Sequence, residues 1–449
     1  MRSSRVADPK KRSSPRGPAI ELSIKEIAGG GDGVAIVETN GERRAVFVRG
    51  SVPGDVVRAR VDFASRPAHA QVTELLSSSP DRVKPACAYV DRCGGCGWMH
   101  IARISQPNFH VSIVRSALPE MWRDANVVAH PSPGGRRTRA RLHVRTGHHT
   151  RGGAKVGFYQ NKSHELVSVD TCVALHPALD RARASLPALF ENARGEGEAE
   201  IALGQVAAKD ELRKPVLDLS WKGELPAAFF SRLDAGVKNG DWQGARISTE
   251  GSRVPMTIGD PTPWIHGGDD APLRLAPGGF AQASEEGNLA LSKRVAELAR
   301  AAIEKRPTEA AVVELYAGAG NFTVLLARFG KVIAVESNAA ACESAQENLR
   351  SRNLTARVVN ADAATYAIPG KTAVVVLDPP RTGAREACEK IVAARARNVV
   401  YVSCDPATLG RDLAILERGS YALESIETFE MFPDTSHVET VVSLTRRTK

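Results

Sequence analysis

A cysteine stands at an unusual position in the stretch YVSCDP, residues 401–406. Cys404 follows an apolar run typical of a buried strand, and the next two residues, Asp405 and Pro406, are typical of an N-cap and a first helical residue. The partial positive charge at a helix N-terminus favours a thiolate. Because a free thiol is only slightly ionised at neutral pH, about 1 kcal/mol of such stabilisation raises the thiolate population several-fold. We therefore predict that Cys404 is a nucleophile.

Other polar residues at the ends of apolar runs belong to the same argument. Asp378 follows the apolar run of VVVLDPP. Ligands of a parallel sheet bind beyond the carboxyl ends of its strands, so Asp378 and Cys404 are expected at one site. The alternative is that Asp378 has no role in the site and only caps the Pro-Pro turn that follows it. Cys342 and Cys388 lie within helical stretches and are predicted to be core thiols.

A glycine turn follows the apolar run at the start of VVELYAGAGNFT, residues 312–323. Gly318 and Gly320 would let a ligand approach the backbone closely at the start of a helix. A turn with a purely structural role fits the two glycines as well. The dinucleotide fingerprint has a third glycine where Thr323 stands, which argues against NAD.

Two acidic residues follow the next apolar runs. Glu336 ends KVIAVES and could accept both hydroxyl groups of a ribose. Asp362 lies in VVNADA and could contact an adenine edge. Together with the glycine turn, these positions resemble the nucleoside-binding side of class I S-adenosylmethionine methyltransferases.

Four further cysteines precede the predicted catalytic region. Cys87, Cys93 and Cys96 have the spacing C-x5-C-x2-C, and Cys172 stands alone. Four thiolates can hold zinc or a cubane iron–sulfur cluster, and the spacing does not choose between them. A zinc ribbon usually has two CxxC pairs, whereas only one is present here. Core thiols without a ligand are a third possibility.

The elements that must position these residues change along the chain. Short apolar runs alternate with amphipathic stretches over residues 276–449, which predicts a doubly wound, Rossmann-like parallel sheet. Residues 18–76 predict a small antiparallel β-barrel, and residues 77–275 a mainly β region. Residues 1–17 are predicted to be a disordered basic arm. The fold class expected is therefore multidomain, with α+β and α/β parts.

Composition excludes several classes of protein. The chain has 449 residues, of which 43% are hydrophobic and 25% charged, as in ordinary soluble proteins. No run approaches the ~18 apolar residues of a membrane span, and the N-terminus lacks a signal-peptide core, so a cytoplasmic protein without membrane contact is expected. The formal net charge is +9, and residues 1–17 hold six basic residues and one acidic residue. Such an arm suits loose phosphate contact, although a solvated tail without function fits as well.

A second basic feature lies in RRTRARLHVR, residues 136–145. Arg137, Arg139 and Arg141 alternate along a predicted strand and so share one face. Such a face can be merely solvated, but its place between the barrel and the C-terminal region suggests contact with nucleic-acid phosphates.

Three motifs in order make a family resemblance specific. DPPRTG (378–383), YVSCDPATLGRD (401–412) and FPDTSHVETV (432–441) resemble the RNA uracil-5-methyltransferase family. The N-terminal barrel resembles a TRAM domain, and CGGCGWMH (93–100) resembles the iron–sulfur segment of the members that carry a [4Fe–4S] cluster. The resemblance covers nearly the whole chain after the arm.

The resemblance implies a chemistry that the residues can be tested against. C5 of uracil is a poor nucleophile, so addition of the Cys404 thiolate at C6 would create an enolate whose C5 attacks the methyl group of S-adenosylmethionine. By the family pattern, Glu439 then removes the C5 proton. Asp378 would hold the base or the amino-acid part of the cofactor. Other cofactor contacts implied by the family are Gln282, Tyr316, Asn321, Glu336 and Asp362.

This sequence departs from the family pattern at three positions. Ser284 stands where asparagine is usual, Ala281 where a second phenylalanine is usual, and Asp434 where histidine is frequent. The first two put the fine packing around Gln282 in doubt, but not Gln282 itself. The four cysteines before the catalytic region would, by the same resemblance, hold the cluster.

Structured RNA is the partner that the resemblance implies, with a loop uridine of 23S ribosomal RNA as the leading substrate, since a base leaves its stack more easily in a loop. The same reaction on transfer RNA stays open. Cytosine-5 methylation fits less well, because Glu439 stands where the base of a uracil enzyme is expected. Amino-methylation fits less well, because those enzymes tend to have an aromatic residue after the Pro-Pro pair, where Arg381 stands here. A non-catalytic RNA-binding protein would be expected to lack Cys404 or Glu439. A monomer is expected.

Overall fold

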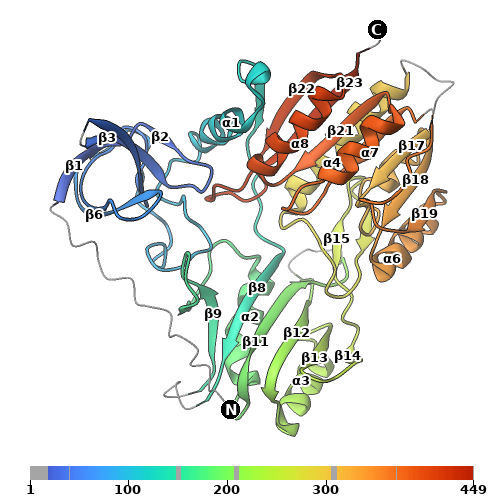
Figure 1. Ribbon diagram of the computed structural model, residues 1–449. Coiled ribbons are helices and arrows are strands. Elements are labelled where there is room, and N and C mark those ends of the chain that lie inside the picture. The colour runs from blue at the N-terminus through green and yellow to red at the C-terminus, as the bar shows by residue number, and fades with distance from the viewer. Residues whose placement is uncertain are drawn as a thin grey trace, which may run out of the picture.

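The computed structural model describes residues 19–39, 41–147, 153–206, 212–304, 311–370 and 372–447. Three β-rich parts follow one another along the chain, and irregular segments connect them (Figure 1). The basic arm predicted over residues 1–17 lies outside the described residues. Within the described part of the chain, no helix is long and apolar enough to cross a membrane.

The N-terminal part is a curled six-stranded sheet with the strand order β1-β5-β6-β4-β3-β2 (Figure 1). Alternate side chains such as Leu22, Val46 and Ala59 fill its interior. The sequence predicted an antiparallel barrel. The structure confirms a small curved β unit, but β4 and β6 pair in parallel. Its strands are β1 (Ala19–Ser23), β2 (Glu26–Ile27), β3 (Gly33–Thr39), β4 (Glu42–Val48), β5 (Val56–Asp62) and β6 (Ala68–Ser77).

The central part is a seven-stranded sheet with the order β10-β9-β8-β11-β12-β13-β14. Its strands are β8 (Arg139–Arg145), β9 (Lys155–Tyr159), β10 (Leu166–Ser168), β11 (Arg194–Leu203), β12 (Pro215–Glu224), β13 (Gly244–Thr249) and β14 (Met256–Gly259). The helices α2 (Pro177–Leu189) and α3 (Ala227–Asn239) pack on one face. The sequence predicted a mainly β region here, and both helices are a correction. Leu179, Ala182 and Leu186 carry the helical spacing of α2, but Pro187 inside the helix obscured it.

The C-terminal part is an eight-stranded sheet with the order β19-β18-β17-β20-β21-β23-β22-β7. The first five strands are parallel, and β23 pairs antiparallel with both β21 and β22. The strands are β17 (Ala311–Leu315), β18 (Lys331–Glu336), β19 (Arg357–Asn360), β20 (Val374–Leu377), β21 (Asn398–Ser403), β22 (Tyr421–Phe429) and β23 (Glu439–Arg446). The edge strand β7 (Val127–His130) comes from the segment before the central sheet.

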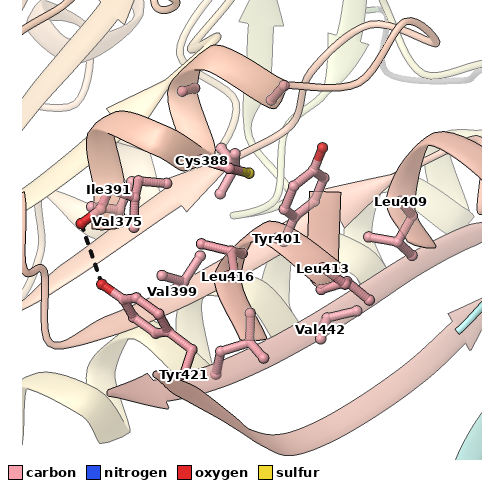
Figure 2. Close-up of a cluster of buried hydrophobic side chains, with 14 of the residues drawn as sticks. Val375, Cys388, Ile391, Val399, Tyr401, Leu409, Leu413, Leu416, Tyr421 and Val442 are labelled. Carbon is pink, nitrogen blue, oxygen red and sulfur yellow. Dashed lines mark hydrogen bonds between the residues drawn. The ribbon is translucent and has the colours of Figure 1, made fainter. Parts of the chain in front are cut away.

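Helices cover both faces of this sheet, as a doubly wound fold requires. One face packs against α4 (Glu285–Glu304), the other against α7 (Arg385–Ala394) and α8 (Pro406–Arg418). Figure 2 shows the second layer, where Leu409, Leu413 and Leu416 meet the sheet and Tyr421 donates to the carbonyl oxygen of Ile391. Each such fully buried leucine contributes about 1.5–3 kcal/mol.

The remaining elements connect these layers. They are α1 (Gln106–Ala117), the 3-10 turn Glu120–Trp122, the hairpin β15 (Trp264–His266) and β16 (Pro272–Arg274), and the helices α5 (Thr323–Leu326) and α6 (Ala339–Arg350). Cys388 on α7 is fully buried and Cys342 on α6 nearly so, which confirms both as core thiols.

Candidate active site

The predicted site residues gather at the carboxyl edge of the C-terminal sheet. Tyr316 follows β17, Glu336 ends β18, and Asp362 lies two residues beyond β19. Asp378 follows β20, and Cys404 follows β21. Because these strands are parallel, their carboxyl ends lie along one edge of the sheet.

Strand register brings Cys404 and Glu439 side by side. In the antiparallel pair β21–β23, Ser403 is the partner of Thr440. The next position outward on each strand is therefore Cys404 and Glu439. The predicted nucleophile and the predicted base come from segments that are far apart in sequence, and the pairing of two buried strands sets their separation.

The helix that begins after Cys404 is capped as predicted. Asp405 is the N-cap of α8, its Oδ1 accepts from the backbone nitrogen of Thr408 at 2.8 Å, and Pro406 is the first helical residue. The expected increase in acidity of the thiol does not follow, however. Burial, together with the nearby carboxyl groups of Glu439 and Asp378, raises the pKa of Cys404 to about 12. The prediction of a helix-stabilised thiolate is wrong for the protein without substrate, because desolvation and two acidic neighbours outweigh the helix terminus.

The two carboxyl groups are themselves perturbed. Burial, with the charge of Asp378, raises the pKa of Glu439 to about 8. Burial raises the pKa of Asp378 to about 7. Oε2 of Glu439 is buried and has no hydrogen-bond partner. A desolvated carboxyl group with a pKa near neutrality and an unpaired oxygen suits a group that accepts a proton from a substrate.

Arg381 supplies positive charge to this cluster and was not predicted as a site residue. Its charge lowers the pKa of both Cys404 and Glu439, against the effect of burial. Burial, together with the charge of the same guanidinium, lowers the pKa of His437 to about 4, and the His437 imidazole is therefore neutral. The signal in the sequence was a cation within the motif DPPRTG, directly after a strand-end acid.

Helix α8 holds the backbone of the segment 381–384 in place. Thr408 Oγ1 donates to the carbonyl oxygen of Arg381 at 3.1 Å. The guanidinium of Arg411 donates to the carbonyl oxygen of Thr382 at 2.9 Å and to Asp412. Asp412, which is fully buried, accepts from the backbone nitrogen of Ala384 at 2.6 Å. We call these three helix residues, Thr408, Arg411 and Asp412, the α8 clamp.

On the cofactor side of the edge, the glycine turn lies beside Glu336. Glu336 Oε2 accepts from the backbone nitrogen of Gly318 at 2.9 Å, which ties the glycine turn to the next strand end. Gly318 and Gly320 have φ values of +55° and +85°, and a Cβ on Gly318 would meet open space. The left-handed backbone therefore explains the glycines, while the space beside Gly318 is free for a ligand.

The other predicted cofactor contacts are placed less uniformly. Gln282 is buried, and its Oε1 has no hydrogen-bond partner, as suits a ligand contact. Tyr316 has the left-handed φ of +63°, and Asp362 caps its own turn through Ala364. The side-chain amide of Asn321 instead binds Asn288 and Ser292 on α4. Asn321 thus lies at the edge, with its side chain engaged by the protein.

Four cysteines gather around one cavity of about 220 Å³ in the irregular segment before α1 and beside the central sheet. They are Cys87, Cys93, Cys96 and Cys172. Burial raises the pKa of Cys96 to about 11 and also raises that of Cys93 and Cys172. Arg137 Nη2 lies 3.5 Å from the Cys96 sulfur.

The thiols of this cavity accept hydrogen bonds from the backbone. Backbone nitrogens of Tyr89 and Gly95 donate to the sulfurs of Cys87 and Cys93, both at 3.4 Å, and such bonds stabilise thiolates. A zinc ion with Zn–S distances of about 2.3 Å would draw its thiolates close together. No group of three Cys, His, Asp or Glu residues in the described part of the chain has an arrangement that would hold one metal ion.

The arginines of β8 are not a free basic face. Arg139 forms an ion pair with Glu200 at 2.5 Å, and Arg141 lies 3.7 Å from Glu198. Both glutamates come from the neighbouring strand β11. Arg137 donates to the carbonyl oxygen of Gly95 and points to the cysteine cavity. Strand pairing thus supplies acidic partners that the local sequence lacks, and contact of these arginines with phosphates stays a prediction.

Comparisons with known proteins agree over almost the whole chain. The family model described as tRNA (uracil-5-)-methyltransferase matches residues 278–447. A 23S rRNA (uracil(1939)-C(5))-methyltransferase of Pseudomonas putida is 33% identical over 446 residues, which cover 95% of this chain and 93% of the relative. An uncharacterized RNA methyltransferase of Gloeobacter violaceus is 31% identical, covering 96% of this chain and 97% of the relative.

A solved structure shares the fold. The tRNA (uracil-54, C5)-methyltransferase of Pyrococcus abyssi, solved in complex with S-adenosyl-L-homocysteine, superimposes with a TM-score of 0.70 at 22% identity. The match covers 95% of this chain and 100% of that chain.

Proposed function

Because the chain belongs to the RNA uracil-5-methyltransferase family, we propose that it transfers a methyl group from S-adenosylmethionine to C5 of a uridine in 23S ribosomal RNA. The observation that carries the chemistry is the pairing of Ser403 with Thr440, which sets Cys404 beside Glu439 at the edge of the sheet. Relatives at about a third identity over nearly the full length favour ribosomal over transfer RNA.

The first step is addition of sulfur to the pyrimidine. The Cys404 thiolate forms a bond to C6, the electron pair of the C5–C6 double bond forms a C4–C5 double bond, and the negative charge moves to O4 as an enolate. C5 then attacks the methyl group of S-adenosylmethionine, and S-adenosylhomocysteine leaves with the electron pair of the broken S–CH₃ bond. Arg381 is the cation whose charge favours the thiolate within this cluster.

The second step is removal of the C5 proton. Glu439 takes that proton, the C–H electron pair restores the C5–C6 double bond, and the C6–S bond breaks to return the thiolate. The unpaired Oε2 of Glu439 supports this role. The thiol proton must leave before addition, and the raised pKa of Asp378, about 7, makes this carboxyl group a second proton carrier in the site.

The cofactor would lie along the ends of β17 to β20. Gln282, with its unpaired Oε1, would bind the amino-acid part or the base, and Glu336 the ribose. The glycine turn would pass beneath the nucleoside. Asp362 and Tyr316 would complete the cofactor site, and Asn321 would act through its backbone.

We further propose that the cysteine cavity holds a [4Fe–4S] cluster. Cys87, Cys93, Cys96 and Cys172 would be its ligands, and the N–H donors to two of these sulfurs support thiolate ligation. An iron–sulfur cluster can transfer electrons or stabilise the fold around it. Because methyl transfer needs no net electron, a structural role is the one that fits here. Its function here would be to order the segment between the N-terminal sheet and α1. The expectations of a TRAM-type RNA-binding unit, a monomer and a cytoplasmic location stay predictions.

The proposed function is tested with ribosomal RNA from a strain that lacks this protein. Purified protein and methyl-labelled S-adenosylmethionine should label that RNA, and mapping should place 5-methyluridine at one uridine. Label in transfer RNA instead would assign the alternative substrate. No label in any RNA would contradict an enzymatic role.

A further inference from the structure

The catalytic base is the first residue after an irregular connection. β22 ends at Phe429 and β23 begins at Glu439. Asp434, in the middle of this connection, is buried and has a φ of +65°. A non-glycine residue holds this conformation only when its surroundings compensate for the strain.

Helix α1 and the segment before it supply that compensation. Gln106, fully buried at the start of α1, accepts from the backbone nitrogen of Asp434 at 2.9 Å and donates to Asp434 Oδ1 at 3.2 Å. Arg103 Nη2 donates to Asp434 Oδ2 at 2.8 Å. Both oxygens and the backbone nitrogen of Asp434 are therefore bound by residues more than 300 positions away.

A second set of contacts flanks the first. The backbone nitrogen of Trp98 donates to the carbonyl oxygen of Asp434 at 2.8 Å, and its indole donates to the carbonyl oxygen of Gly31 at 3.0 Å. The rings of Trp98 and His110 stack at 4.8 Å, and His110 Nε2 lies 3.0 Å from the carbonyl oxygen of Thr435.

The N-terminal sheet reaches the same connection. A Cβ on Gly31 would lie 2.9 Å from Ser436, so the loop before β3 packs directly on this segment. Figure 1 shows α1 between the N-terminal sheet and the end of the C-terminal sheet.

We propose that Gln106 and Asp434 are positioning residues that hold Glu439 for proton removal, an inference that rests on the proposed function. Neither residue needs to contact RNA or cofactor. Cys404 is also held by the pairing of β21 with β20 and by the cap of α8, so loss of the Gln106–Asp434 contact displaces the base and leaves the nucleophile in place. The slowed step is the one in which the C5 proton goes to Glu439 and the C6–S bond breaks.

The aspartate side chain suits this position. Its carboxylate meets both a guanidinium and an amide. The side chain also explains the tolerance of a positive φ, because Asp visits this region more readily than most residues.

The test is the fate of the covalent intermediate in Gln106→Met, which keeps side-chain length and removes both hydrogen bonds to Asp434. We expect turnover to fall about tenfold or more while a methylated protein–RNA adduct accumulates. Arg103→Gln, at an arginine side chain that is 61% exposed, removes only the ion pair and folds without a core change. It should give the same adduct in smaller amount.

The matched control is Asn398→Met at the opposite end of β21. The amide of Asn398 makes one donated and one accepted hydrogen bond, to Ala373 and Thr445, whereas that of Gln106 donates to Trp98 and Ile101 as well as to Asp434. It should lower thermal stability without any accumulated adduct. The inference is wrong if the wild type methylates RNA but Gln106→Met and Arg103→Gln each lose adduct formation and turnover in equal proportion. If the wild type transfers no label, the proposed function fails first.

Discussion

The catalytic edge and the cysteine cavity are assembled in different ways. Cys404, Asp378 and Glu439 sit at the ends of buried strands, and the ladder β20-β21-β23 sets their positions. Cys87, Cys93 and Cys96 come from an irregular segment with turns and isolated bridges, and Cys172 lies just before α2. Backbone pairing sets the strand ends of the first site, and side-chain contacts add to it, whereas the second site has little regular structure to define it.

The electrostatic environments of the two sites also differ. At the catalytic edge, two carboxyl groups and one guanidinium surround the thiol, and the pKa values of these groups can change when a substrate displaces water. In the cavity, the Arg137 guanidinium lies beside the Cys96 sulfur and lowers the pKa of that thiol, against the larger effect of burial. We infer that the groups at the catalytic edge are suited to proton transfer. The thiols of the cavity are suited to hold the proposed cluster, which would order the surrounding segment.

The largest effect is expected at the nucleophile. Cys404→Ala should reduce methyl transfer at least a thousandfold and abolish the covalent adduct, because no other described side chain at the edge can add to C6. Cys388→Ala, in the core layer, is the control and should retain activity with lower stability. Transfer of labelled methyl groups to RNA measures both. Substantial activity in Cys404→Ala would remove the basis of the comparison.

The α8 clamp is expected to have the next largest effect. Asp412→Asn keeps the size of the buried side chain but weakens its hold on Ala384 and Arg411, so Arg381 is less well placed. We expect a fall of about 10- to 100-fold in kcat with little change in KM for S-adenosylmethionine.

A double-mutant cycle tells positioning from general destabilisation. If Asp412 acts through Arg381, Asp412→Asn should add little to the defect of Arg381→Ala. Fully additive defects would mean that the clamp serves stability alone.

Much of the catalytic edge could be predicted from sequence. The apolar runs before Glu336, Asp378 and Cys404 mark strand ends, and a parallel sheet brings strand ends together. The partners across the sheet could not be predicted, since Glu198 and Glu200 oppose the β8 arginines only through pairing that is remote in sequence.

Electrostatics and tertiary contacts explain the other differences. The acidity of Cys404 was misjudged because desolvation is a property of the assembled site and not of the helix that follows it. The contacts of Asp434 with Gln106 and Arg103 join segments that no local pattern connects.

The dependence on pH reports on the reactive groups of the catalytic edge. The raised pKa of Cys404 and the raised pKa of Glu439, about 8, both mean that the reactive, deprotonated forms increase as pH rises. Because Glu439 acts after methyl transfer, the rate of adduct formation should follow the ionisation of Cys404 and increase between pH 6 and 9, by about tenfold per pH unit at most. Rapid-quench trapping of the adduct measures this rate. A flat profile with full rate at pH 6 would show that ionisation of Cys404 does not limit addition.

The smallest effect on methyl transfer is expected at the cysteine cavity. Cys93→Ser in protein purified without oxygen should lose iron and acid-labile sulfide and melt at lower temperature. The enzyme that remains folded should retain methyl transfer within about tenfold, because the cavity is not part of the strand-end edge. Cys342→Ser, at a core thiol outside the cavity, is the control and should keep its iron. Full iron content in Cys93→Ser would contradict the ligand assignment.

The division of labour between sulfur and carboxylate is tested most directly with Glu439→Gln. Incubated with unmodified ribosomal RNA and labelled S-adenosylmethionine, this variant should accumulate a conjugate in which Cys404 is bonded to a uridine that already carries the labelled methyl group. Mass spectrometry of the nuclease- and protease-digested conjugate identifies both partners. Normal turnover by Glu439→Gln, or a conjugate at another residue, would contradict the account.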